Sequence, residues 1–378
     1  MFKVLIWDHT GESAKWCEQR LEKAEIEIVQ TITPAQLVPE ILLQKDAWDW
    51  LLIFERNMRR DFDSTIRTLK LPLEKIIYAL DPVSWAQRPK AIYTLLNNAG
   101  GGGIRRRLTV NNCIAINNFF TCTVENLSYI ALSEDRMRIT NMFVSQGNWA
   151  SPEMKRFQEL AKQYYNVDES SGYFLDLGAN IGTTGLYFIK KLAPNLKLLS
   201  FEPDPENFKM HRCNIILNDC EDKAVLVNCG LGNEPDELTL YRRQPHNWGA
   251  NTFIKTDSAT PVGNIKVIPL DSYFAENKIA ASEVKYIWID TEGFEPQVLL
   301  GAKNLLKENP VPLFVEYNLA SWSKSELFED MMTLLAEHYS HFIHFWRGET
   351  LYPLEALRTM EKKDYMGDIF LIKRGLIA

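Results

Sequence analysis

Short apolar runs alternate with helical segments along the first hundred residues. The runs cover residues 4–7, 27–29, 50–54 and 75–80. Their length and their content of β-branched residues are typical of buried parallel strands. Since strands that alternate with helices form right-handed βαβ units, the pattern predicts a small doubly wound, Rossmann-like α/β domain over residues 1–98. Its role is not evident from the pattern.

A glycine run interrupts this pattern. Residues 100–103 are four consecutive glycines, and each glycine loses much backbone entropy when it is ordered in a helix or a strand. The run therefore predicts a linker at 99–103 and a second domain at 104–378. Residues 104–150 are rich in Asn, Thr and β-branched residues, and we expect short antiparallel strands there as the entry to the second domain.

The alternation of strands and helices returns from residue 173 onward. Seven runs are predicted to be strands: 173–177, 197–202, 223–229, 285–290, 311–316, 341–346 and 368–373. They predict a large, mostly parallel sheet with one reversed strand at its edge. Residues 233–284 form an insertion between the third and the fourth of these strands. Insertions at the carboxyl ends of strands commonly build a substrate site.

The composition narrows the classes of partner. The net charge of −7 and the pI of about 5.6 argue against a general affinity for nucleic acid or for anionic membranes. The six cysteines are scattered without a Cys-x-x-Cys pair, which excludes a zinc or disulfide framework. No signal peptide or membrane span is evident. These features predict a cytoplasmic protein, and they leave its oligomeric state open.

The most informative motif is a glycine turn after the strand at 173–177. Asp176, Gly178, Asn180 and Gly182 follow one another at every second position. Such a turn lets the polar end of a ligand lie against bare backbone and the N-terminus of a helix. A dinucleotide site would have a glycine in place of Asn180, so a nicotinamide or flavin cofactor is disfavoured. Asp176 suits a ligand with a cationic end, such as the amino group of S-adenosylmethionine.

Acidic residues end three further strands. Glu202, which precedes Pro203, has the position from which a carboxylate grips a ribose in a doubly wound sheet. Asp290 ends the strand at 285–290 and Glu292 lies two residues later, and Glu316 ends the next strand. Acids in such places serve as bases, as metal ligands or as anchors for neighbouring loops. Three converging metal ligands are not evident, so no metal is assigned.

The order of these motifs resembles the FkbM-type methyltransferases. The segments that carry the resemblance are 175–182, 201–208, 267–271, 289–302 and 315–316, within a region of about 115–375. The family consists of class I enzymes that depend on S-adenosylmethionine and methylate oxygen, often on sugars or natural products. The resemblance thus implies a Rossmann-like, seven-stranded, mostly parallel sheet. Thr291 departs from the family pattern, which more often has Val there.

The resemblance also implies roles for individual residues. The methionine part of the cofactor is implied to be held by Asp176, Gly178, Asn180 and Gly182. The ribose is implied to be held by Glu202 and Pro203, and the adenine to be contacted by Leu231 and Gly232. Asp290 and Glu292 correspond to acidic residues at the edge of the active site in this family. Asp290 is thereby expected to contact both the cofactor and the acceptor. Removal of a proton from an alcohol requires a base, for which the candidates are Asp290, Glu292, Glu316 and His246.

The sequence thus predicts an O-methyltransferase that acts on a hydroxyl of a sugar, a glycan or a related small molecule. Two alternatives stay open at this point: a nicotinamide-dependent oxidoreductase, and a non-catalytic binding module with a methyltransferase fold. Trp248 and Trp322 are the preferred pair for stacking on a sugar face, although ordinary packing is an equal alternative for each.

Overall fold

The computed structural model divides the chain into two compact units, Met1–Asn148 and Trp149–Ala378. It describes the following residues: 2–8, 26–32, 44, 47, 50–54, 76–79, 114–116, 119–132, 150–244, 247–348, 350–360 and 366–377. The predicted linker at 99–103 lies outside these residues, so the boundary that it implies stays a prediction.

The described residues of the first unit form two small sheets. One is fully parallel with the order β2-β1-β3-β4, as the apolar runs predict. Its strands are β1 (Phe2–Asp8), β2 (Ile26–Ile32), β3 (Trp50–Phe54) and β4 (Ile76–Ala79). The other is an antiparallel meander of β5 (Ile114–Ile116), β6 (Phe119–Val124) and β7 (Leu127–Leu132). The antiparallel strands expected between 104 and 150 are therefore present, and they belong to the first unit.

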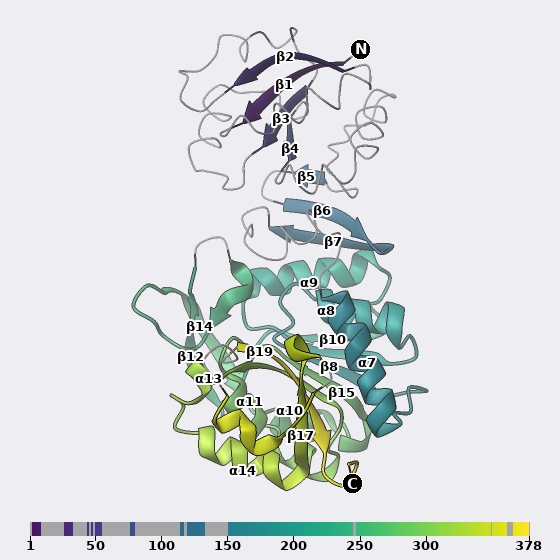
Figure 1. Cartoon of the computed structure of the whole chain (residues 1–378), viewed down its shortest axis with the longest axis vertical. Coiled ribbons are helices and arrows are strands. Elements are labelled where there is room, and N and C mark those ends of the chain that lie inside the picture. Colours follow the sequence, from purple (N-terminus) through teal and green to yellow (C-terminus); the bar gives the residue numbers. More distant parts are fainter. Residues whose placement is uncertain are drawn as a thin grey trace. The chain divides into compact units, whose positions relative to one another are not determined.

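The second unit is built on a large sheet flanked by helices (Figure 1). The sheet has eight strands in the order β10-β9-β8-β15-β16-β19-β17-β18. Its strands are β8 (Tyr173–Leu177), β9 (Lys197–Phe201), β10 (Ala224–Val227), β15 (Val284–Ile289), β16 (Leu313–Asn318), β17 (Tyr339–His344), β18 (Leu351–Pro353) and β19 (Met366–Lys373). All seven predicted strands are present. Two strands are reversed. The short β18, which pairs antiparallel with β17, is the reversed strand at the edge, although it is not one of the seven predicted strands. The reversed strand among the seven is β19, which lies inside the sheet between β16 and β17.

This strand order is the class I methyltransferase arrangement. When the seven predicted strands are numbered along the chain, the sheet reads 3-2-1-4-5-7-6, and the seventh strand is reversed. The order changes direction between β8 and β15, which pair in parallel. An open α/β sheet binds ligands at such a switch point, beyond the carboxyl ends of its strands. The topology therefore confirms the Rossmann-like fold and locates the site.

Helices cover both faces of the sheet. The longer helices of the unit are α7 (Ser151–Tyr165), α9 (Pro205–Leu217), α10 (Leu270–Asn277) and α14 (Phe328–His338). Shorter segments are α8 (Thr183–Tyr187), α11 (Glu295–Leu300), α12 (Lys303–Glu308), α13 (Leu319–Trp322), the π-helix η3 (Phe188–Leu192), and the 3-10 turns η4 (Trp248–Ala250), η5 (Ala281–Glu283), η6 (Phe345–Arg347) and η7 (Leu354–Arg358). Among the described helices, none combines the length and the apolar character needed to cross a bilayer.

The two faces of the sheet have different cores, because successive residues of a strand point to opposite faces. On one face, Phe157 of α7 contacts the rings of Tyr286, Trp288, Phe314 and Phe370. On the other face, aliphatic residues such as Leu175, Ile287 and Val315 pack with α10, α11, α12 and α14. Buried from both sides, the strands hold their carboxyl ends, and the loops that follow them, at fixed positions.

The insertion forms a second sheet together with β11, which precedes it in the chain. It has the order β11-β14-β12-β13, from β11 (Gly230–Leu231), β12 (Asp236–Arg242), β13 (Asn251–Thr252) and β14 (Thr260–Ile268). The hairpin of β12 and β14 carries residues 243–244 and 247–252 toward the carboxyl edge of the large sheet. The strand-like runs expected within 233–284 are thus present, and they supply one wall of the site described next.

Candidate active site

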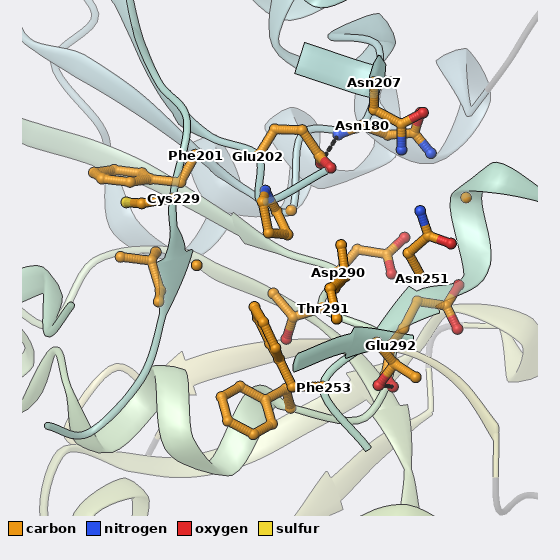
Figure 2. Close-up of a pocket in the computed structure, with 18 of the residues that line it drawn as sticks. Asn180, Phe201, Glu202, Asn207, Cys229, Asn251, Phe253, Asp290, Thr291 and Glu292 are labelled. Carbon is orange, nitrogen blue, oxygen red and sulfur yellow. Dashed lines mark hydrogen bonds between the residues drawn. The ribbon is translucent and has the colours of Figure 1, made fainter. Parts of the chain in front are cut away.

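A pocket with an empty volume of about 530 Å³ opens at the switch point of the large sheet (Figure 2). Loops after β8, β9, β10 and β15 form one side, and the insertion forms the other. The lining residues used below include Gly178, Asn180, Glu202, Pro203, Asn207, Leu231, Trp248, Asn251, Asp290 and Glu292. Seven of the residues predicted from the sequence therefore meet in this pocket: Gly178, Asn180, Glu202, Pro203, Leu231, Asp290 and Glu292.

The glycine turn supplies bare backbone to the pocket. Gly178 has φ +93°, and Asn180 has φ +52° in the left-handed region that asparagine tolerates. The backbone N–H groups of Gly178 and Ala179 both donate to the carbonyl oxygen of Phe201 at 3.0 Å, which ties the turn to β9. A Cβ atom on Gly178 would overlap the carbonyl oxygen of Asp290. Glycine is thus required here by both conformation and space.

Glu202 lies beside this turn and is 5% exposed. Its Oε2 accepts from the backbone N–H of Asn180 at 2.7 Å, and its Oε1 accepts from that of Asp204 at 2.8 Å. Burial, reinforced by the charge of Asp204, raises the pKa of Glu202 to about 8. Because a carboxylate oxygen can accept more than one hydrogen bond, both oxygens keep capacity for donors from a ligand.

Three of the predicted cofactor residues lie behind the pocket wall. Asp176 is buried and accepts from the backbone N–H of Gly185 at 2.8 Å, and burial raises its pKa to about 7. A Cβ atom on Gly182 would overlap the imidazole of His211. The carbonyl oxygen of Gly232 packs against Gly301, where a Cβ atom would overlap it. Their direct contact with a cofactor stays a prediction, since none of the three lines the pocket.

The edge formed by β15 and β16 collects carboxylates. One oxygen each of Asp290, Glu292 and Glu316 lies within 4.8 Å of the others. Burial, and then the charge of Glu292, raises the pKa of Asp290 well above its ordinary value. Burial and the charge of Asp290 do the same for Glu316, whose Oε2 is buried without a hydrogen-bond partner. Carboxyl groups this close together titrate as a coupled set. The three carboxylates also offer the oxygen ligands that a hard cation prefers.

Arg243 of the insertion balances part of this charge. Its Nη1 lies 3.1 Å from Oε2 of Glu292, and its Nη2 donates to the backbone carbonyl of Glu292. Glu292 itself has φ +55°, a strained backbone conformation for this residue type. The guanidinium therefore fixes both the charge and the position of Glu292.

A buried acid that the sequence reading missed holds the loop after β15 in place. Glu295 is 0% exposed, and its Oε1 accepts from the backbone N–H groups of Thr291 at 2.9 Å and Gly293 at 3.1 Å. Its Oε2 accepts from Nε1 of Trp322 at 2.8 Å. Trp322 is also 0% exposed, so the expectation that it stacks on a sugar is wrong. Its ring packs in the core and its N–H supports the loop.

The wall opposite the glycine turn comes from the insertion and from α9. Asp204 caps α9 by accepting from the backbone N–H groups of Glu206 and Asn207. Its Oδ2 accepts from Nδ2 of Asn251 at 2.7 Å and lies 3.5 Å from Nη2 of Arg242. The guanidinium of Arg242 stacks 3.5 Å from the ring centroid of Trp248. The position of His246 lies outside the described residues, so its candidacy as a base stays a prediction.

The comparison with protein families decides the identity of this unit. Residues 176–342, which contain the glycine turn and all the strand-end acids, match the methyltransferase FkbM domain. The chain contains an FkbM methyltransferase domain. The predicted resemblance is thereby confirmed, and with it, at the level of the family, the predicted cofactor S-adenosylmethionine.

Individual relatives of the FkbM domain are more distant. Methyltransferase sdnD of Sordaria araneosa is 37% identical over 71 residues, which are 19% of this chain and 27% of that protein. Methyltransferase 1 of Beauveria bassiana is 28% identical over 146 residues, which are 34% of this chain and 57% of that protein. The chain thus spans less than two thirds of the length of either relative.

Solved structures show weak similarity. A methyltransferase FkbM from Methylobacillus flagellatus KT has 14% identity and a TM-score of 0.36, with 98% of this chain and 90% of that one covered. TYW2 of M. jannaschii in complex with AdoMet has 8% identity and a TM-score of 0.33, with 68% and 86% covered. The strand order, rather than these similarities, establishes the fold.

The residues of the FkbM domain fit a nucleoside with a polar tail. Phe201, Leu231, Leu240, Phe253 and Phe294 give the pocket an apolar side. Glu202 and the turn at Gly178 give it a polar side with bonding capacity for hydroxyl or ammonium groups. An apolar surface for a base beside a carboxylate for a ribose is the division that S-adenosylmethionine requires.

Proposed function

We propose that the chain is an S-adenosylmethionine-dependent O-methyltransferase that acts on a hydroxyl of a sugar, a glycan or a related small-molecule natural product. One observation carries the proposal: Gly178 and Glu202 line the same pocket as Asp290 and Glu292. A site for a nucleoside cofactor and a pair of acids therefore share one space. The match to the FkbM domain and the two methyltransferase relatives support the same reaction class.

Each half of the pocket has a separate task in this proposal. Bound S-adenosylmethionine supplies an electrophilic methyl group for substitution. Glu202 and the bare backbone at Gly178 orient the nucleoside, which is mainly a positioning task. The apolar side chains around Leu231 exclude water from one side of the pocket. Asp290 then lies between the cofactor half and the acceptor half.

Asp290 is the base in this proposal. A base is most effective when its pKa lies near the working pH, and burial together with the charge of Glu292 raises the pKa of Asp290 from its ordinary value. Its carboxylate can thus accept the proton of the acceptor hydroxyl, which the acidic cluster then shares. Arg243 keeps Glu292 in its ion pair, so Glu292 is the less available base.

Calorimetry separates the proposal from its alternatives. Titration with S-adenosylhomocysteine and with NAD is expected to show binding of the first alone. Binding of NAD alone would indicate an oxidoreductase. Binding of neither compound would indicate a non-catalytic module.

The acceptor is tested by a screen of nucleotide sugars and glycans with a labelled methyl donor. Transfer of label to a hydroxyl by the wild type, and its loss in Asp290→Asn, is the expected result. Full turnover by Asp290→Asn would remove Asp290 from the role of base. Label on nitrogen or carbon in place of oxygen would contradict the proposed acceptor class.

A further inference from the structure

Trp248 lies in the wall of the pocket, whereas Trp322 is buried in the core. It opens the turn η4 of the insertion, and it is partly exposed. A large aromatic side chain in a pocket wall offers a ligand apolar area together with a defined ring plane. Of the two tryptophans that the sequence singles out for stacking, Trp248 is therefore the one that a ligand can reach.

Arg242 holds the indole of Trp248 in a fixed position. Its guanidinium stacks 3.5 Å from the ring centroid, a geometry that this planar group favours. Asp204 lies 3.5 Å from Nη2 of Arg242, and Nε of Arg242 donates to Oδ1 of Asn251 at 3.4 Å. Nδ2 of Asn207 donates to the carbonyl oxygen of Trp248 at 3.0 Å, which fixes the backbone. The ring is thus held in place by the protein itself.

A ring held in this way is suited to stacking. A pre-organised aromatic surface loses little conformational freedom when a ligand binds, so the contact keeps most of its free energy. Because a cation already covers one face of the indole, the ring offers a ligand its remaining surface. One face of a sugar ring consists of C–H groups, and it matches an apolar ring surface in size and polarity. Trp248 therefore favours an acceptor with such a face.

The charges of the pocket restrict the acceptor further. Among the described residues that line it, the acidic ones are Glu202, Asp290 and Glu292, and none is Lys, Arg or His. Arg242 and Arg243 of the insertion already pair with carboxylates. A phosphate or a carboxylate on the acceptor would therefore meet charge of its own sign, without a cation to offset it. Hydroxyl groups, in contrast, can donate to the carboxylate oxygens.

The acids and the insertion share one side of the pocket. Figure 2 shows Asn251, Asp290 and Glu292 on one side and Phe201 on the other. The turn η4 connects Trp248 directly to Asn251. This side therefore combines a stacking surface with acceptors for hydroxyl groups, and an uncharged sugar needs both.

We infer that Trp248 stacks on the acceptor, and that the acceptor is an uncharged sugar ring, alone or in a glycoside, rather than a nucleotide sugar or another anionic saccharide. The inference rests on the proposed function, because it specifies the acceptor of that reaction. Trp248 then determines acceptor specificity, and Arg242 is a positioning residue that acts through it. The insertion thereby selects the acceptor, while the loops of the large sheet hold the cofactor.

A comparison of matched acceptors tests the charge of the acceptor. Methyl glycosides of glucose, galactose, mannose and N-acetylglucosamine are each compared with the sugar 1-phosphate and the nucleoside diphosphate sugar, with labelled S-adenosylmethionine as the donor. For the sugar that is methylated, kcat/KM is expected to be about tenfold or more higher for the glycoside than for either charged form. An equal or higher value for a charged form would overturn the inference.

Two further outcomes separate the inference from the proposed function. Binding of S-adenosylhomocysteine without methyl transfer to any of these saccharides would overturn the inference and leave the cofactor assignment intact. Failure of the wild type to bind S-adenosylhomocysteine would overturn the proposed function, and the inference with it.

Trp248→Leu tests the stacking contact. Loss of the ring is expected to raise KM for the glycoside about tenfold, with kcat within about threefold of the wild type. Trp248→Phe keeps an aromatic face, so its KM should stay within about threefold of the wild-type value. Affinity for S-adenosylhomocysteine, measured by calorimetry, should change by less than about twofold in both variants. An unchanged KM in folded Trp248→Leu, or an equal rise in Trp248→Phe, would overturn the stacking contact.

Arg242→Lys provides a second test that leaves the indole in place. Lysine keeps a positive charge beside Asp204 but lacks the planar group that covers the ring. KM for the glycoside is therefore expected to rise about threefold. This variant carries the test if Trp248→Leu does not fold, and a wild-type KM would then overturn the inference.

Tyr241→Leu is the matched control on the same strand. Tyr241 precedes Arg242 on β12, and it is not among the residues that line the pocket. The control removes an aromatic ring from the insertion, and KM for the glycoside is expected to stay at the wild-type value. A rise of about tenfold in this control would attribute the effects to a loosened insertion, and would overturn the inference.

Discussion

The two halves of the pocket edge are made in different ways. After β8 and β9 the ligand surface is backbone, with Gly178 in a conformation and a space that exclude a side chain. After β15 and β16 the surface consists of carboxyl groups. Burial and the charge of Glu292 raise the pKa of Asp290, and burial and the charge of Asp290 raise that of Glu316. Shape therefore determines the first half, whereas the second half depends on electrostatics.

Because of this difference, the two halves are sensitive to different kinds of substitution. A cradle of backbone groups is lost when a side chain is added at Gly178, and the backbone groups themselves do not titrate. A carboxylate cluster accepts isosteric replacement without a change of fold, but loses its chemistry. Substitutions that test one half should consequently leave the other half intact, and the following predictions run from the largest expected effect to the smallest.

Gly178→Ala is expected to have the largest effect. The new Cβ would overlap the Asp290 carbonyl, and φ +93° disfavours any side chain. We expect a loss of about 3 kcal/mol or more in the free energy of unfolding, with no measurable binding of S-adenosylhomocysteine. Urea unfolding and calorimetry measure both.

Gly263→Ala is the matched control, because a Cβ there meets nothing within 4 Å. Its stability should stay within about 0.5 kcal/mol of the wild type. Wild-type binding by Gly178→Ala would show that the cradle is not the cofactor surface.

Asp290→Asn tests the charged half. The amide keeps the shape and cannot accept a proton, so turnover is expected to fall by about 10²–10⁴-fold. Affinity for S-adenosylhomocysteine should change only a few-fold, because the backbone cradle is untouched. The exposed Asp257 in the turn of the insertion offers Asp257→Asn as a control with unchanged turnover. A large loss of affinity without a loss of turnover would reverse the roles of the two halves.

Asp176 predicts a pH dependence of stability in the cradle half. Its pKa of about 7 in the folded chain lies above its ordinary value of 3.8. The folded state then binds more protons than the unfolded state between these values, so stability falls as pH rises from 4 to 7. The loss is on the order of 2 kcal/mol after allowance for local relaxation. Asp176→Asn should flatten this part of a urea-unfolding series over pH, and an unchanged slope would show that Asp176 titrates normally.

Arg243→Met should affect stability modestly. It removes the partly buried ion pair to Glu292, with an expected loss of about 1 kcal/mol, while Lys209→Met, which removes an exposed pair with Glu206, should cost less. The pH profile of turnover should also shift, since Glu292 loses its fixed partner. Equal melting temperatures for the two variants would mean that the Arg243 pair contributes no more than a surface pair.

Chelation is expected to have the smallest effect. The guanidinium of Arg243 already neutralises Glu292 at 3.1 Å, where a cation would compete with it. Turnover in EDTA should therefore stay within about twofold of the untreated value. If EDTA lowers turnover by more than twofold and added Mg²⁺ restores it, the acceptor hydroxyl is activated by a cation bound to the three acids and not by Asp290 alone.

Local motifs made the cradle predictable. Strand runs, Gly178 and Glu202 are close in sequence, and their spacing reflects one βαβ unit. The reversed β19 between β16 and β17 was not predictable in position, because sequence order does not give strand order in a sheet. The burial of individual side chains was not predictable either. Trp322 follows a strand end, where a binding residue is expected, but its ring is buried in the core.

Residues that act through long-range packing were missed as well. Arg243 and Asn251 of the insertion meet Glu292 and Asp204 only because the insertion folds back over the carboxyl edge of the large sheet. Their types carry no motif, and their spacing to the glycine turn has no fixed value. Glu295, three residues after Glu292, offered one sequence clue. A second acid so close to the end of a buried strand needs hydrogen-bond donors, and it therefore indicates a residue that holds the loop in place.

Asp204 has a consequence for any attempt to re-engineer the acceptor side. One of its oxygens caps α9, and the other receives Asn251 and faces Arg242. The carboxylate is 0% exposed, so a grafted loop without equivalent donors would leave an unpaired charge in the interior, at a cost of several kcal/mol. Loop exchange on this scaffold must therefore transplant Arg242 and Asn251 with the new segment, or replace Asp204 by a neutral cap such as serine.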